Sequence, residues 1–257
     1  MTQDLFRQDA YLRECSAQLT SVTEAGIVLD RTVFYPLGGG QAGDSGVLAL
    51  ADGTALAIAD TRKGKNAEGN PTSDIVHIPA PEQEALLATL TPGTAVTARI
   101  DWERRHRMMR LHTTSHLLCH VVPQLVNGCS ITPDYARLDF AMTDPLDKEQ
   151  LTAAIAALVA AAHPLTVASI SDEELDANPT LVKSMSVQPP RGTGRIRTIR
   201  IGGDGCEGGA PLIDLQPCGG THVANTAEIG AIVVTKIEKK SATTRRVVLG
   251  FAHERSE

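Results

Sequence analysis

The first hundred residues alternate between apolar and polar positions in short runs, which Gly, Asp and Asn interrupt. Alternation with a period of two is typical of a β-strand that buries one face. Several short strands at close spacing predict a small barrel-like β domain over residues 1–98. The predicted strands are residues 15–22, 26–30, 47–50, 55–59, 74–78 and 94–100.

From Asp101 the apolar period becomes helical. Met108, Leu111 and Leu118 share one helical face and predict a long helix that ends before Asn127, with Pro123 able to shorten or kink it. The rest of residues 99–257 predicts an α+β domain with helices packed on an antiparallel sheet. Its elements are strands 135–142, 165–170, 195–201, 231–238 and 246–252, a helix over 145–162 capped by Asp144, and a short helix capped by Ser171 and Glu174.

Composition narrows the class of protein. An apolar content of 42% over 257 residues is enough for ordinary globular cores and favours two domains. No run approaches the roughly 20 apolar residues of a membrane helix, and residues 1–20 do not read as a signal sequence. An odd number of unpatterned cysteines, 5, indicates reduced thiols and a cytoplasmic protein. The oligomeric state is left between a monomer and a weak dimer.

Charge is unevenly distributed along the chain. The formal net charge of −6 argues against a nucleic-acid partner, because such affinity comes mainly from neutralised phosphates. Basic residues nevertheless gather in three places, so a basic face on an acidic protein and ordinary solvated charge are equally open. The three clusters are Arg104, Arg105, Arg107 and Arg110; Arg191, Arg195, Arg197 and Arg200; and Lys236, Lys239, Lys240, Arg245 and Arg246.

Two pairs of metal-competent side chains carry the strongest chemical signal. His112 and His116 are four residues apart on the predicted helix, so they project from one face about one turn apart. Cys218 and His222 repeat the spacing around two glycines. Two chance pairs are improbable with 8 His and 5 Cys, and a mixed nitrogen and sulfur set favours one Zn²⁺ per chain.

The His pair by itself leaves several classes of protein open. A zinc metalloprotease needs a Glu directly after the first His, and Thr113 stands there instead, which nearly excludes that class. A structural zinc module that binds RNA without catalysis would use the same four ligands. A hydrolytic zinc needs an open or displaceable coordination position, and we expect His222 to be the displaceable ligand.

Glycines concentrate between residues 38 and 46. They permit positive φ angles and a close approach of the backbone to another group. No Lys-Ser or Lys-Thr follows them, so this is not a Walker phosphate loop. A turn between strands explains the segment equally well.

These motifs together resemble a known family. The wording HTTSHLL at 112–118 and PCGGTHV at 217–223, with RTVFYPLGGGQAGDSG at 31–46, is similar to the editing domain of alanyl-tRNA synthetases and to the free-standing AlaX proteins of medium length. The resemblance runs from about Asp30 to Phe251. No stretch resembles the class II aminoacylation domain, so a free-standing protein is expected.

The resemblance implies a zinc-dependent deacylase that hydrolyses mischarged Ser-tRNA(Ala), with Gly-tRNA(Ala) as a second candidate. The implied partner is tRNA, with no DNA and no membrane. In that family Thr32 would reach a seryl hydroxyl, and Asp139 would orient a ligand His or a water, so both are candidate catalytic residues. The implied substrate-binding residues are Gly38, Gly39, Gly40, Gln41, Arg245 and Arg246.

The chain departs from the family pattern in one place. Many synthetase editing domains carry a Gln before a Gly-Ser pair after the His helix. Here residues 126–130 read Val-Asn-Gly-Cys-Ser, so the role of that Gln has no counterpart.

Overall fold

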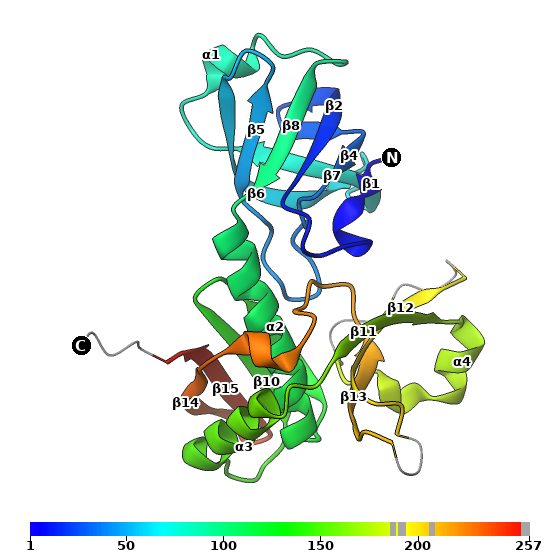
Figure 1. Ribbon diagram of the computed structural model, residues 1–257, viewed down its shortest axis with the longest axis vertical. Coiled ribbons are helices and arrows are strands. Elements are labelled where there is room, and N and C mark those ends of the chain that lie inside the picture. The colour runs from blue at the N-terminus through cyan, green and yellow to red at the C-terminus, as the bar shows by residue number, and fades with distance from the viewer. Residues whose placement is uncertain (186–188, 190–193, 206–208, 253–257) are drawn as a thin grey trace. The chain divides into compact units, whose positions relative to one another are not determined.

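The computed structural model of the protein describes residues 1–185, 189, 194–205 and 209–252 (Figure 1). Arg191 lies outside the described residues. The chain divides into two compact units, Met1–His106 and Arg107–Glu257. Their border falls within helix α2, Trp102–Val121, whereas the predicted border after residue 98 falls inside strand β8. The α+β class is confirmed.

Six antiparallel strands of the first unit form a closed barrel in the order β2-β3-β7-β6-β5-β8, in which β8 pairs back onto β2. Each predicted strand lies on one of them, although β6 and β7 are longer than predicted. The barrel strands are β2 Glu14–Thr23, β3 Gly26–Leu29, β5 Gly46–Leu50, β6 Ala55–Lys65, β7 Pro71–Pro79 and β8 Ala95–Ile100. The same unit contains β1 Gln3–Asp4, η1 Leu5–Arg7, β4 Arg31–Thr32 and α1 Glu84–Leu87.

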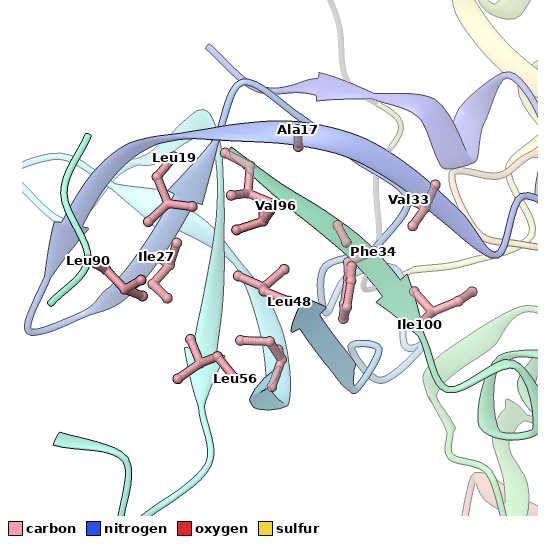
Figure 2. Close-up of a cluster of buried hydrophobic side chains, with 13 residues drawn as sticks. Ala17, Leu19, Ile27, Val33, Phe34, Leu48, Leu56, Leu90, Val96 and Ile100 are labelled. Carbon is pink, nitrogen blue, oxygen red and sulfur yellow. The ribbon is translucent and has the colours of Figure 1, made fainter. Parts of the chain in front are cut away.

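Alternate side chains of β2, β3, β5, β6 and β8 point into one apolar core. Figure 2 shows Leu19, Ile27, Leu48, Leu56 and Val96 converging from five different strands. All of them are nearly or fully excluded from solvent. The alternation in the sequence is therefore the alternation between the barrel interior and its surface.

A buried ion pair anchors the glycine-rich segment inside the first unit. Arg105 and Asp44 are both fully buried, and Arg105 Nε lies 3.1 and 3.0 Å from the two carboxylate oxygens of Asp44. The guanidinium also donates to the carbonyls of Val33 at 2.7 Å and Ala10 at 3.0 Å, and Asp44 accepts from the Tyr35 amide at 2.6 Å. Because both charges are paired and hydrogen-bonded, removing either partner would leave an uncompensated buried charge.

The second unit contains two separate antiparallel sheets. A four-stranded sheet in the order β14-β15-β10-β9 packs against α3, as Figure 1 shows, and a three-stranded sheet has the order β11-β12-β13. The first sheet consists of β9 Val126–Ile131, β10 Tyr135–Ala141, β14 Ile232–Ser241 and β15 Thr244–Phe251. The second consists of β11 Leu165–Ile170, β12 Ile196–Gly202 and β13 Leu212–Pro217. The helical elements are α3 Lys148–Ala160, α4 Asp172–Ala177, η2 Pro179–Leu181 and η3 Thr226–Ile229.

Several predicted boundaries are corrected. Helix α2 stops at Val121, two residues before Pro123, because the proline ring disfavours helical backbone at the residue before it. Asp147, not Asp144, caps α3 by accepting from the Gln150 amide. The capping box of Ser171 and Glu174 on α4 is confirmed.

Two strands of the second unit were not predicted. Residues 126–131 form strand β9 rather than a turn, and Asn127 is the extra residue of a bulge opposite Asp139 and Phe140. Strand β13 leads directly to Cys218. Within the described part of the chain, no helix is long and apolar enough to cross a membrane.

His77 is a fully buried histidine of the barrel. Its Nδ1 donates to the Ile27 carbonyl at 3.0 Å, so its Nε2 accepts from the Thr32 hydroxyl at 2.8 Å. Burial lowers the pKa of His77 from 6.5 to about 4. The folded barrel therefore holds this ring neutral where the unfolded chain would bind a proton.

We expect acid to destabilise the first unit through His77. The neutral His77 ring contributes its full stabilisation of the folded state above its unfolded pKa of 6.5. This contribution is lost as the pH falls toward its folded pKa of about 4. The loss amounts to up to about 3 kcal/mol of unfolding free energy. Urea unfolding at a series of pH values measures it, and the curve for His77→Gln should be flatter between pH 7 and 5. Parallel curves for the two proteins would contradict this account.

Candidate metal centre

The two histidines of helix α2 lie on one buried face. His112 and His116 are 4% and 5% exposed, and their ring centroids are 5.4 Å apart. This is the separation that one helical turn gives to residues four apart. The helix therefore presents two imidazoles side by side, as the spacing predicts.

Cys218 and His222 come from the loop that follows strand β13. Strand β12 holds this loop, because the Arg197 guanidinium donates to the carbonyls of Cys218 at 2.6 Å and Gly220 at 3.1 Å. The Gly220 amide lies 3.4 Å from Cys218 Sγ. The turn around the two glycines thus brings the thiol and the His222 ring to the same side.

The four side chains fit a tetrahedral zinc ion. In such a site the bond lengths place sulfur and nitrogen ligands roughly 3.5 Å apart. Cys218 Sγ lies 3.5 Å from His112 Nε2 and 3.3 Å from His222 Nε2. The potential ligand atoms of all four residues, His116 included, lie within 4.8 Å of one another. The donor set and the distances both match zinc rather than calcium or magnesium.

Two of the imidazoles have defined partners on their outer nitrogens. His116 Nδ1 donates to Asp214 Oδ2 at 2.8 Å. His222 Nδ1 lies 3.2 Å from the Thr113 hydroxyl, which also accepts from the Val223 amide at 3.3 Å. Outer hydrogen bonds of this kind leave Nε2 directed at the shared centre.

The electrostatics of the cluster favour a thiolate. Burial alone would raise the pKa of Cys218, but the neighbouring imidazoles, His112 above all, hold that pKa well below its ordinary value through charge and hydrogen bonds. Burial would lower the pKa of His116, yet the Asp214 carboxylate and the Cys218 thiolate raise it to about 9. Both shifts reflect ionised side chains packed against one another out of water.

Thr32 lies in the first unit and is fully buried. Its hydroxyl donates to His77 Nε2 at 2.8 Å and accepts from the Phe34 amide at 3.1 Å. Both functions of the hydroxyl are thus used inside the barrel unit. The structure gives Thr32 a part in the barrel, and a contact with substrate remains a prediction.

The glycine-rich candidates form a tight hairpin tip in the first unit. The backbones of Gly38 and Gln41 exchange hydrogen bonds of 3.1 and 3.0 Å. Gly39 and Gly40 between them have φ angles of 58° and 84°, which a two-residue hairpin turn requires and glycine adopts without strain. Gln41 is fully buried. The expected turn between strands is found, while substrate binding is untested.

The Asp139 carboxylate pairs with Arg246 rather than with a ligand histidine. Arg246 donates to both Asp139 oxygens, at 2.6 and 2.7 Å, and this lowers the pKa of Asp139. Arg245 is buried, and its guanidinium donates to the carbonyls of Ser241 and Thr244 at the turn between β14 and β15 and to that of Thr143, which follows β10. Both arginines of the predicted substrate-binding pair therefore have partners within the second unit.

Sequence patterns did not point to three residues of the centre: Asp214, Lys183 and Thr113. Asp214 was detectable in principle, because the apolar and polar residues from Ile213 to Gln216 alternate and predict a strand. On such a strand Asp214 and Gln216 share a face. Lys183 carries no comparable signal, because it lies 31 positions before the carboxylate that it contacts.

Two family models match parts of the chain. A family model described as the threonyl and alanyl tRNA synthetase second additional domain matches residues 196–248, which include Cys218 and His222. A model described as class II (A) tRNA synthetases matches residues 8–104. This second match covers most of the barrel unit. The chain is thus related to aminoacyl-tRNA synthetases over both units.

Full-length relatives define the family more closely. The chain is 32% identical over 251 residues to the alanyl-tRNA editing protein AlaX-M of Saccharolobus solfataricus, covering 96% of this chain and 98% of that protein. It is 32% identical over 269 residues to AlaX-M of Methanosarcina mazei, at 100% and 99% coverage. A match at 34% identity to the alanine–tRNA ligase of Hyperthermus butylicus covers 93% of this chain but 24% of the ligase. The chain belongs to the alanyl-tRNA editing protein family of the AlaX-M type.

We expect Cys218→Ala to lose at least about 100-fold in zinc affinity, because the variant removes the thiolate from a four-ligand set. Metal content after dialysis against a zinc buffer measures the loss. Cys15→Ala, which changes a partly buried thiol of the barrel unit, is the matched control. Undiminished zinc in Cys218→Ala would show that the site is wrongly assigned.

Proposed function

We propose that this protein is a trans-editing hydrolase that uses one zinc ion to deacylate mischarged Ser-tRNA(Ala), with Gly-tRNA(Ala) as a second candidate. One observation carries the proposal: a cluster of three buried imidazoles and one partly buried thiol in a chain of the alanyl-tRNA editing family. An aminoacyl ester is already activated toward hydrolysis. The enzyme therefore needs chiefly a polarised carbonyl, an aligned water and a means of excluding alanine.

His112, His116, Cys218 and His222 would hold the ion. A zinc ion at this position supplies Lewis-acid polarisation of the ester carbonyl and makes water more acidic. Burial of the three imidazoles keeps bulk water from the ligands. Asp214 keeps a proton on Nδ1 of His116, so that Nε2 is free to bind the metal.

A hydrolytic role requires that one of the four ligands can be displaced from the metal, and we propose that His222 is this ligand. Its outer nitrogen contacts a neutral hydroxyl at 3.2 Å, whereas His116 is held by a carboxylate at 2.8 Å. Hydrogen bonds to ionised groups are roughly twice as strong as neutral ones. The imidazole of His222 is therefore less firmly held than that of His116.

The partner that we propose is tRNA, which fits the name of the relatives as alanyl-tRNA editing proteins. Within the cluster of basic residues from 236 to 246, Arg245 is buried and Arg246 is paired with Asp139. Lys239 and Lys240 are exposed on strand β14. We therefore propose that these two lysines, rather than the two arginines, contact the phosphates of the tRNA.

Purified protein loaded with zinc should release serine from Ser-tRNA(Ala) at least about tenfold faster than alanine from Ala-tRNA(Ala), because a site that bonds the seryl hydroxyl leaves a polar group unpaired with alanine. Chelation should abolish the difference, and added zinc should restore it. Acid-quenched assays of radiolabelled aminoacyl-tRNA measure both rates. Absence of zinc-dependent serine release, with tRNA binding intact, would favour a structural zinc module and contradict an editing enzyme.

Replacing Lys239 and Lys240 together by Gln should weaken tRNA binding and reduce its dependence on salt, by up to about 0.9 in slope for each phosphate that the variant no longer neutralises. The double change Lys63→Gln, Lys65→Gln removes the same charge from exposed positions of the barrel unit and is the control. Filter binding at several salt concentrations gives both slopes. Equal slopes for wild type and the Lys239, Lys240 variant would remove these lysines from the interface.

A further inference from the structure

Asp214 is a buried carboxylate with both oxygens occupied. It lies on strand β13 and is 2% exposed. Oδ2 accepts from His116 Nδ1 at 2.8 Å and from Gln216 Nε2 at 2.9 Å. Oδ1 accepts from the ammonium group of Lys183. The two oxygens thus face different elements, a metal ligand on one side and a cation on the other.

Lys183 is held in place by its own backbone. Its carbonyl accepts from the Val126 amide at 2.8 Å, and the Met185 amide donates back to Val126 at 2.9 Å, which pairs this segment with the start of β9. The Lys183 side chain is 27% exposed, whereas the Asp214 side chain is fully buried. A chain of contacts therefore runs from β9 through Lys183 and Asp214 to His116.

Building on the proposed zinc site, we propose that Asp214 is the positioning residue of His116 and that Lys183 determines which Asp214 oxygen His116 meets. A carboxylate that accepts from Nδ1 fixes the imidazole tautomer whose Nε2 carries the lone pair. It also fixes the ring plane, because the hydrogen bond removes the rotation about χ2. The family resemblance implies such an orienting role for Asp139, whereas we assign it to Asp214 from its contact with His116.

This arrangement makes Asp214→Asn more damaging than loss of charge alone. An amide has one acceptor oxygen and one donor NH2 group, and the Lys183 ammonium takes the oxygen because it can only donate. The NH2 group is then left against His116 Nδ1. Two donors cannot bond, so His116 shifts to the tautomer protonated on Nε2, and this nitrogen can then no longer bind the metal.

Removing Lys183 as well should restore part of the affinity. In the double variant Lys183→Met, Asp214→Asn, the side chain at position 183 cannot donate to the amide oxygen. The amide can therefore turn, and its oxygen can accept a hydrogen bond from His116 Nδ1. A purely structural role of the two residues predicts that metal affinity follows the free energy of unfolding in both variants, because residues in direct contact are coupled in stability. The double variant therefore separates positioning from simple support of the fold.

Competition with a chromophoric chelator measures the dissociation constants of Zn²⁺ and Co²⁺ for the full chain. We expect Asp214→Asn to weaken metal binding by about 10- to 100-fold and the double variant to bind several-fold more tightly than Asp214→Asn. Glu238→Gln, which neutralises a carboxylate paired with Lys236 in the same unit, is the control with unchanged affinity. Unchanged affinity in Asp214→Asn, or further loss in the double variant, would overturn the proposal.

Far-UV circular dichroism of the metal-free proteins checks that each variant folds. Should Asp214→Asn not fold, the zinc-loaded wild type decides the question by NMR. There the His116 ring must show a hydrogen-bonded Nδ1 proton and a coordinated Nε2, and coordination through Nδ1 would overturn the proposal. A wild type that binds no zinc would instead refute the zinc site itself.

Discussion

The central constraint is that two imidazoles one helical turn apart must lie next to a thiol from the loop that follows strand β13. Helix α2 supplies His112 and His116, and the loop after β13 supplies Cys218 and His222 within 4.8 Å. The two sulfur–nitrogen distances, 3.5 and 3.3 Å, are those of a tetrahedral site, so the local fold of the second unit already fits a metal. The site therefore exists only when the end of β13 packs next to α2.

Three buried or partly buried carboxylates show how the chain keeps charges out of solvent. Asp44 pairs with Arg105, Asp139 with Arg246 and Asp214 with Lys183. Each pair avoids the penalty of an isolated buried charge. Asp44 fixes the glycine-rich segment, Asp139 joins neighbouring strands, and Asp214 alone of the three also bonds a candidate metal ligand. The ion pairs of Asp44 and Asp139 thus support the fold, whereas that of Asp214 also supports the candidate metal site.

Local patterns predicted much of the structure. The alternation of strand 15–22, the capping box of Ser171 and the two ligand pairs all depend on residues a few positions apart. The role of Asp214 was not predictable, because its partner His116 is 98 positions away in the sequence. The hydrogen bond between Thr32 and His77 was not predictable either, because the two residues are 45 positions apart. Side-chain pairing across elements is set by tertiary packing, which a single sequence does not display.

X-ray absorption at the zinc edge of the purified protein tests the central claim most directly. The account predicts one sulfur ligand at about 2.3 Å and imidazole nitrogens at about 2.0 Å, from Cys218 and the histidines. Two of these nitrogens should persist with a bound ester analogue if His222 is displaced. A first shell without sulfur would contradict the account, because the three histidines alone do not make up the proposed site.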